Sequence, residues 1–294
     1  MKIYAIPFFG AFLEAVGTIL EKKILRGKID FRSYNVFSFL AIIILIIPCL
    51  LLLGYFFPVL FSLKIHSSAL ELKNIFIMAL IITFSILANL LIFYAMKWEK
   101  ITEIEPLRLF QPLFVVIFAF ILYSSERQTA TPLIIAAVVA SLALIFSHIK
   151  KHHLKISKYS IAAFLGSMFF AAELAISKEI LNFYSPMSFY LVRCFFIFII
   201  TFLIFKPKIS SISKKKWPYV FLVAFIWILY RILLYFSYET KGVIITTLLF
   251  ILAPVFIYAL SYYYLKEKPN WRNILAAIVI LLCVAYAMII TSLS

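Results

Sequence analysis

Charged side chains and glycine are both scarce in this chain. Only 14% of its 294 residues are charged and 65% are hydrophobic, whereas soluble domains carry about 25% charged residues. A soluble fold could not hide so much apolar surface, so water-soluble classes are excluded and lipid is the expected solvent. There are only six glycines, and the apolar runs are continuous rather than alternating. This pattern excludes an outer-membrane barrel and predicts spanning helices, whose backbone groups are satisfied within each segment.

Motifs for chemistry are missing as well. The chain has no Walker A phosphate loop, no H-E-x-x-H zinc motif, no G-x-S-x-G turn and no D-x-x-D acidic cluster. Cys49, Cys194 and Cys283 stand alone within apolar runs, which indicates buried thiols rather than a disulfide framework. We therefore expect no cofactor, no metal and no enzymatic activity. The alternative is an intramembrane enzyme such as a lipid or prenyl transferase.

Acidic residues are also few, 12 against 28 basic ones, which gives a formal net charge of +16. Such a charge is typical of nucleic-acid-binding proteins, but here the basic residues lie in short links between apolar runs. Positions of this kind lie beside anionic lipid headgroups. The expected macromolecular partner is therefore the lipid bilayer, and nucleic-acid binding is excluded.

Ten apolar runs approach the length of about 20 residues that a spanning helix requires. The first set of five is 3–25, 34–57, 75–96, 103–123 and 131–148, and the second is 159–181, 186–205, 217–238, 243–264 and 271–291. The first run contains Glu14 and no cleavage site follows it, which indicates a retained helix rather than a signal peptide. The expected fold class is an all-α, polytopic membrane protein of about ten transmembrane helices.

The two sets repeat the same landmark residues in the same order. Gly10 and Lys22 precede Gly166 and Lys178 by the same interval, since 166 − 10 and 178 − 22 both equal 156. Further matches follow along the chain: Tyr34 with Tyr190, Pro112 with Pro254, and Glu126-Arg127 with Glu267-Lys268. A unit of five helices reverses the side on which the next unit starts, so the halves 1–149 and 150–294 form an inverted repeat. Inverted repeats are a transporter architecture, with the binding site near the midplane.

These landmarks resemble the EamA-type domain of the drug/metabolite transporter superfamily. That domain has a Gly and a later Lys in its first helix, a Pro in its fourth, a Gly-Glu-Arg-like turn and a closing helix rich in Ala, Leu and Val. Both halves follow this order, except that Ser125 and Lys266 replace the Gly before the Glu. The resemblance implies two EamA-like repeats, with the first four helices of each around a central cavity.

The orientation of the chain remains open between two expectations. If the links alternate between the two sides of the membrane, most basic residues fall on the side opposite the termini, including those in 150–158 and 206–216. Because positive charge marks the cytoplasmic side, this distribution predicts that both termini lie outside. The resemblance implies the opposite, since family members keep both termini in the cytoplasm.

Two carboxylates lie in the middle of predicted helices, Glu14 and Glu173. An ionisable side chain at the bilayer centre costs at least about 2.5 kcal/mol, so each needs a function or a partner. Glu173 lies three residues beyond the counterpart of Glu14 (14 + 156 = 170), on the same helix face. Both are expected to line a central cavity as cation ligands or proton carriers. The alternative is neutralisation by a buried Arg or Lys.

Arg231 is a third candidate, in the middle of 217–238, with Trp227 and Tyr230 nearby. A guanidinium among aromatic rings suits an anionic or π-rich substrate. The alternative is a structural ion pair with one of the embedded glutamates or with Glu239. Asn89 and Tyr258 are further candidate substrate contacts. For Asn89, an interhelical hydrogen bond is the favoured alternative.

The other charged residues within the spans are expected to be structural. Glu105 and Arg108 lie three apart and are predicted to pair directly. Arg193 matches an Arg that is common in the resembled family, but it is expected to extend to the membrane interface, as are Lys22 and Lys178. His148, His152 and His153 are interpreted as part of a solvated basic link rather than as a metal site.

Together these features predict a secondary transporter that exports or exchanges a small organic metabolite by alternating access, with proton coupling as an open possibility. A multi-pass protein of a prokaryotic plasma membrane is expected because no targeting signal is present. A homodimer is an open alternative to a monomer.

Overall fold

The computed structural model describes residues 2–27, 29–108, 110–124, 135–136, 138–140, 142–143, 157–266 and 271–293. Within these ranges the chain is helical, and the nearest approach to a strand is an isolated β-bridge between Ile65 and Tyr184. The α-helices are α1 (Lys2–Leu25), α2 (Phe31–Phe56), α3 (Leu72–Trp98), α4 (Ile101–Arg108), α5 (Phe110–Leu122), α8 (Lys158–Leu181), α9 (Pro186–Phe205), α10 (Trp217–Lys241), α11 (Val243–Phe250), α12 (Ala253–Leu260) and α13 (Trp271–Leu293).

Six helical segments within the described residues are long and apolar enough to cross a membrane: Phe31–Phe56, Leu72–Trp98, Lys158–Leu181, Pro186–Phe205, Lys214–Lys241 and Val243–Tyr264. The all-helical membrane class is therefore confirmed. More than half of the predicted span 131–148 lies outside the described residues, so the count of ten helices remains a prediction.

Local sequence signals set several helix starts. Ser157 and Ser185 each cap a helix, because their hydroxyls accept the backbone N–H groups of Ser160 (3.1 Å) and Ser188 (3.4 Å). Pro186 follows as the first residue of α9, where its missing N–H costs nothing. These caps place the starts of α8 and α9 within a residue of the predicted ones.

The predicted span 243–264 is confirmed as a candidate membrane span, but it is not one regular α-helix. It is divided into α11, α12 and a π-helical turn at Ser261–Leu265, with Ile251 and Leu252 between α11 and α12. Pro254 at the start of α12 explains the interruption, since proline removes a backbone donor and clashes with the preceding turn. The predicted span 103–123 corresponds to α4 and α5, on either side of Leu109, which is not described.

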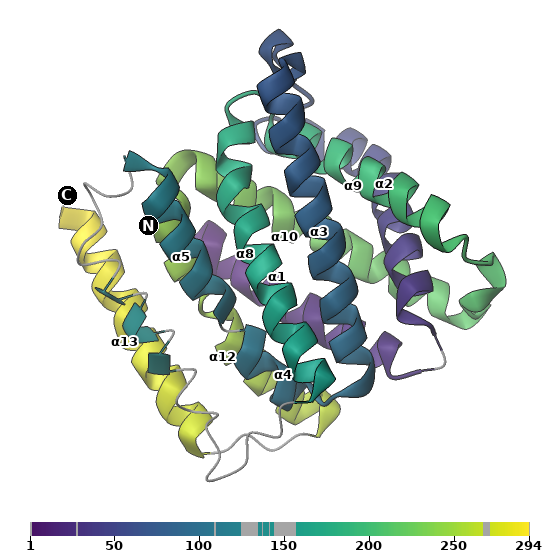
Figure 1. The fold of residues 1–294 in the computed structure, drawn as a ribbon. Helices are drawn as coiled ribbons and strands as arrows, with labels where there is room; N and C mark the ends of the chain where they lie inside the picture. The colour runs from purple at the N-terminus through teal and green to yellow at the C-terminus, as the bar shows by residue number, and fades with distance from the viewer. Residues whose placement is uncertain are drawn as a thin grey trace.

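Helices from opposite ends of the chain interleave (Figure 1). The longest packing interfaces join α8 to α3 and α1 to α10, while α2 packs on α9 and α5 on α8. Gly166 permits the close approach of α8 to α3, because a Cβ there would lie 2.7 Å from Ile92 Cγ1 and 3.3 Å from the Ala88 carbonyl oxygen. The helix α13 lies at the edge of this bundle (Figure 1).

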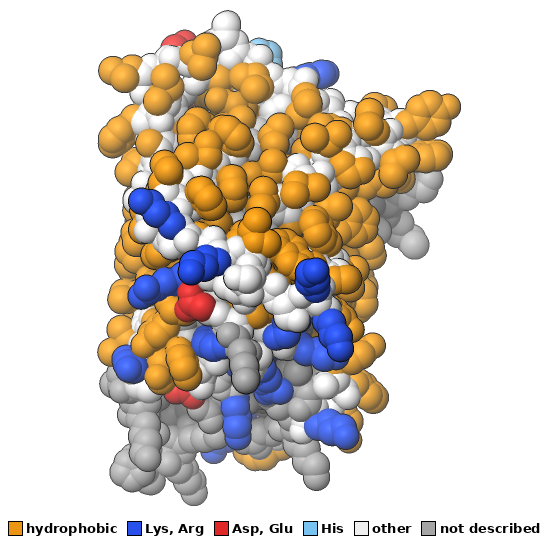
Figure 2. Space-filling model, turned by 90° about the vertical axis from the view of Figure 1, so that its right-hand side faces the viewer, with side chains coloured by type: hydrophobic (Ala, Val, Ile, Leu, Met, Phe, Trp, Pro, Cys, Tyr) orange, Lys and Arg blue, Asp and Glu red, His pale blue; other side chains and the backbone are white. Residues whose placement is uncertain are grey.

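Links that are far apart in sequence meet at the two ends of the bundle. At one end, Lys22 of α1 donates to the carbonyls of Met96 and Glu99. In return, Lys97 donates to the Ile29 carbonyl at 2.6 Å. Figure 2 shows Lys and Arg side chains gathered toward one end of the face in view, below a broad hydrophobic surface. This separation of charge from apolar surface matches a protein that spans a bilayer.

At the opposite end, the link after α2 meets the link between α8 and α9. The His66 N–H donates to the Phe183 carbonyl at 2.9 Å, and the Ser185 N–H donates to the Lys64 carbonyl at 3.0 Å. The links after α1 and α3 thus lie at one end of the bundle, and the links after α2 and α8 lie at the other. This is expected when each long helix crosses the bundle from end to end.

Candidate functional site

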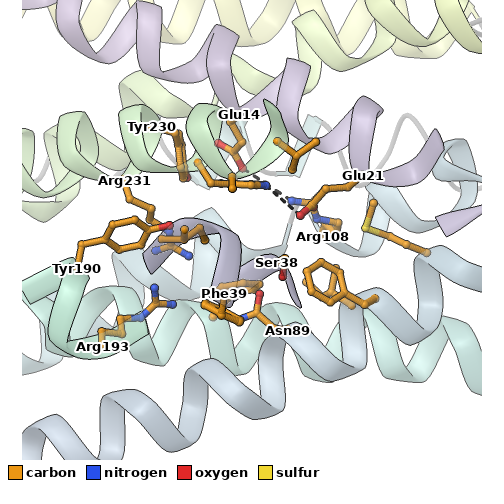
Figure 3. Close-up of a pocket in the computed structure, with 18 of the residues that line it drawn as sticks. Glu14, Glu21, Ser38, Phe39, Asn89, Arg108, Tyr190, Arg193, Tyr230 and Arg231 are labelled. Carbon is orange, nitrogen blue, oxygen red and sulfur yellow. Dashed lines mark hydrogen bonds and ion pairs between the residues drawn. The ribbon is translucent and has the colours of Figure 1, made fainter. Parts of the chain in front are cut away.

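A cavity lies inside the bundle, between helices from both halves of the chain (Figure 3). It encloses about 710 Å³ of atom-free space, including the part open to solvent. Its lining includes the polar or charged residues Glu14, Glu21, Ser38, Asn89, Arg108, Gln111, Tyr190, Arg193, Tyr230 and Arg231, together with Phe39, Phe93, Phe170 and Trp227. This mixture of apolar walls and a few convergent polar groups is typical of small-molecule sites.

A buried ionic cluster forms one wall of the cavity. Glu173 of α8 is 0% exposed and lies between two arginines, 3.1 Å from Arg193 Nε of α9 and 3.4 Å from Arg231 Nη1 of α10. The Tyr235 hydroxyl also donates to Glu173 Oε1, at 3.3 Å. Glu173 itself is not among the residues that line the cavity. The structure places it behind the two arginines, where it neutralises one of their two charges.

The expected extension of Arg193 to the interface was wrong. Its side chain is 1% exposed and lines the cavity, and its Nε also donates to Ser85 Oγ of α3 at 2.9 Å. Arg193 lies on the second turn of α9 and faces α3 and α8, so its guanidinium pairs with Glu173 rather than reaching water. A buried carboxylate partner stabilises the inward position of the guanidinium, which is why it does not extend to the interface.

Aromatic rings surround Arg231 as the sequence suggested. Its guanidinium lies 5.4 Å from the ring centre of Phe170 and 5.7 Å from that of Tyr230, distances within the cation–π range. Trp227 lies on the same helix and also lines the cavity. The structure thus combines both interpretations of Arg231, as a partner of Glu173 and as a cation exposed to the cavity.

Glu14 and Arg108 occupy another part of the lining. Their closest atoms, Glu14 Oε1 and Arg108 Nη2, are 3.8 Å apart, and the side chains are 15% and 10% exposed. Arg108 is predicted to pair with Glu105, whose side chain lies outside the described residues, so that pairing stays a prediction. The pair with Glu14 joins α1 to α4.

A further carboxylate, Glu21, was missed by the sequence analysis. It is 5% exposed, and its Oε1 accepts hydrogen bonds from Trp227 Nε1 (2.9 Å) and the Tyr34 hydroxyl (3.2 Å). Glu21 is seven residues from Glu14, two helical turns on the same face of α1. That spacing could have revealed Glu21, but it lies next to Lys22, which was expected at the membrane interface.

Lys22 also differs from its expected position at the interface. It is 2% exposed and donates to the carbonyls at the end of α3. Unpaired carbonyls at a helix C-terminus are favourable partners for a cation, which explains the inward direction. Lys178 lies with its Nζ 5.0 Å from the ring centre of Tyr123.

The remaining candidates fall in different places. Asn89 lines the cavity and donates to the carbonyl of Ser85 in its own helix at 2.7 Å. The interhelical hydrogen bond in this region is made by Ser85, which accepts from Arg193. Tyr258 is 6% exposed within the core and does not line the described cavities. Among the described residues, no group of three or more His, Cys, Asp or Glu is positioned to hold a metal ion.

A second cavity adjoins the first and shares Glu14, Arg108 and Tyr230 with it. It encloses about 500 Å³ of atom-free space, and its lining includes Ile251, between α11 and α12, and Pro254 at the start of α12. Irregular backbone at membrane depth is tolerated where it lines a cavity. The two cavities together extend the polar interior along the bundle.

Charge is distributed unevenly around the site. Two arginines and the glutamate behind them leave one wall with an excess of positive charge. Around Arg108, the lining holds two carboxylates, Glu14 and Glu21, and this part of the cavity has an excess of negative charge. In Figure 3, Arg193 and Arg231 lie on one side of the cavity and Glu21 and Arg108 on the other.

Comparison with known proteins defines the class. Residues 157–289 match the EamA-like transporter family, which is part of the drug/metabolite transporter superfamily. The resemblance found in the sequence is thereby confirmed for this half. With its apolar helices, the chain is an integral, multi-pass membrane protein with an EamA-like transporter domain.

The fold is shared by a protein of known crystal structure. The two superimpose with a TM-score of 0.70 over 100% of this chain and 99% of the other, at 16% sequence identity. At this identity the likeness shows the fold alone. No curated protein matches the sequence.

Proposed function

We propose that this protein is a secondary transporter that exports or exchanges a small organic metabolite by alternating access. The observation that carries the proposal is the cavity, which is lined by ionisable and aromatic residues from both halves of the chain. A polar, charged interior is costly in a membrane protein and marks a substrate pathway. The family match of residues 157–289 supports transport over other uses of such a cavity.

The proposal includes an inverted repeat of two five-helix units, 1–149 and 150–294. The packing of α1 on α10 and of α8 on α3 supports it, because each half contributes its first helix to the opposite half. Rocking of one unit against the other would expose the cavity to each side in turn. Glu14, Arg231, Trp227, Tyr230 and Asn89 would contact the substrate.

Counterflow in liposomes tests this function. Purified protein would be reconstituted in vesicles loaded with a metabolite pool, and uptake of labelled pool components would be followed. The matched variants are Glu14→Gln, in the cavity, and Glu179→Gln, whose carboxylate lies near Lys73 on the surface with its side chain 35% exposed. Saturable exchange that is lost in Glu14→Gln and kept in Glu179→Gln supports a carrier with its site in the cavity.

Two other outcomes would contradict the proposal. Flux that does not saturate indicates a channel. Product formation without exchange favours an intramembrane enzyme. Proton coupling is tested in the same vesicles, because a coupled carrier accumulates substrate when only a pH gradient is applied.

A further inference from the structure

We propose that Arg193 and Arg231 form a binding site for an anionic group, a carboxylate or a phosphate, on the substrate. The proposal rests on transport as the function of the cavity and specifies the chemistry of what it carries. The first observation is the charge of the cluster. Two buried guanidiniums share one carboxylate, Glu173, which leaves one positive charge without a counterion in that wall. A buried cation of this kind is stabilised when an anion approaches it.

The second observation is an unused hydrogen-bond donor. Arg193 uses Nε for both Glu173 and Ser85, while its buried Nη2 has no hydrogen-bond partner among the described residues. Buried donors are nearly always paired in folded proteins. Because Arg193 lines the cavity, a ligand in the cavity is placed to supply the missing acceptor.

Glu173 acts as a positioning residue in this arrangement. It is 0% exposed and contacts one nitrogen of each arginine, so it holds the two guanidiniums on either side of one point. Phe170 and Tyr230 pack near the guanidinium of Arg231 and restrict its rotation. A guanidinium whose orientation is fixed binds oxyanions with more geometric specificity than a flexible ammonium.

Two carboxylates elsewhere in the cavity lining limit the charge of the ligand. Glu14 and Glu21 would repel a second anionic group that reached them. Phe170 and Trp227 among the lining residues provide apolar contact for the rest of the molecule. The geometry therefore points to a substrate with one anionic group at the arginines and an apolar or aromatic remainder.

Binding by the purified protein in detergent tests the site without requiring transport. The probes are acetate and phenylacetate, their neutral isosteres acetamide and phenylacetamide, and inorganic phosphate, with dissociation constants taken from ligand-induced thermal shifts. We expect at least one anion to bind about tenfold more tightly than its neutral isostere, because a hydrogen bond to a charged group is worth about this factor. Equal shifts for each acid and its amide, with no effect of phosphate, would overturn the proposal.

The variant Arg193→Lys keeps the charge beside Glu173 and removes the second donor nitrogen. We expect it to weaken anion binding about tenfold, while Arg32→Lys, which changes an exposed arginine of α2 outside the cavity, leaves binding unchanged. If Arg193→Lys does not fold, the comparison of acid with amide in the unaltered protein decides alone. Anion binding that is unaffected in a folded Arg193→Lys variant would place the site elsewhere.

The experiments test the transport function and the anion site independently. Saturable counterflow without discrimination between acid and amide would leave the transport function standing and remove the anion site. Anion binding that depends on Arg193, in vesicles that show no exchange, would keep the site and remove transport.

Discussion

Removal of the charge on Glu173 is the sharpest test of the buried cluster. The variant Glu173→Gln keeps the shape of the side chain and an acceptor oxygen for Tyr235, and it leaves two guanidiniums facing each other without a counterion. At an effective dielectric constant of about 20, each of the two ion pairs contributes roughly 5 kcal/mol of attraction. Desolvation of the charges offsets much of this in the intact protein.

Breaking a buried pair by removing one partner costs about 3–5 kcal/mol, since the remaining charge is left uncompensated. We expect Glu173→Gln to fall in this range, because the side chain is 0% exposed and neighbours two cations. The matched control is Glu179→Gln. Its contact with Lys73 is 3.6 Å long, and the two side chains are 35% and 73% exposed, so a loss below about 1 kcal/mol is expected.

The free energy of unfolding would be measured for both variants by SDS titration in mixed micelles. A second variant, Glu173→Gln with Arg231→Met, restores the balance to one net positive charge and should recover part of the lost stability. Equal losses for Glu173→Gln and Glu179→Gln, or no recovery in the double variant, would refute the assignment of a charge-coupled cluster.

Three more predictions concern stability in the same assay. Glu21→Ala should cost about 1–3 kcal/mol because two buried donors lose their acceptor, whereas Glu21→Gln should cost less since its amide oxygen can accept both bonds; equal losses would contradict this contact. Lys22→Met should cost about 1–3 kcal/mol through the two carbonyls it leaves unpaired, and Lys23→Met, at an exposed position, should have little effect. Gly166→Ala should cost about 1–3 kcal/mol because its Cβ would clash with α3. Gly17→Ala, whose Cβ would have 3.4 Å to its nearest neighbour, should be neutral or stabilising.

The sequence predicted where most of the helices lie, because a small number of physical rules determines the positions of spanning helices. Hydropathy alone placed α8 and α9 nearly to the residue. The division of 243–264 was not predicted, although Pro254 was known as a landmark, since a proline is compatible with either a kink or a break. The sequence offered an ion pair between Arg231 and an embedded glutamate as an alternative, but it could not select Glu173, because the two residues lie on different helices and their contact depends on tertiary packing.

The rule that a charge within a membrane indicates function identified Glu14, Glu173 and Arg231, but it did not distinguish their positions. Two arginines offset the free-energy cost of burying the Glu173 carboxylate, and Glu173 lies behind them rather than in the cavity lining. Arg193, which was expected at the interface, lines the cavity and has a buried donor, Nη2, without a hydrogen-bond partner among the described residues. Burial therefore distinguishes embedded charges from exposed ones. The number of hydrogen-bond and ion-pair partners then distinguishes a buried charge that is already neutralised from one that can still bind a ligand. By that measure, Arg193 and Arg231 carry one positive charge more than Glu173 neutralises. An anionic group of the substrate is best placed to neutralise it.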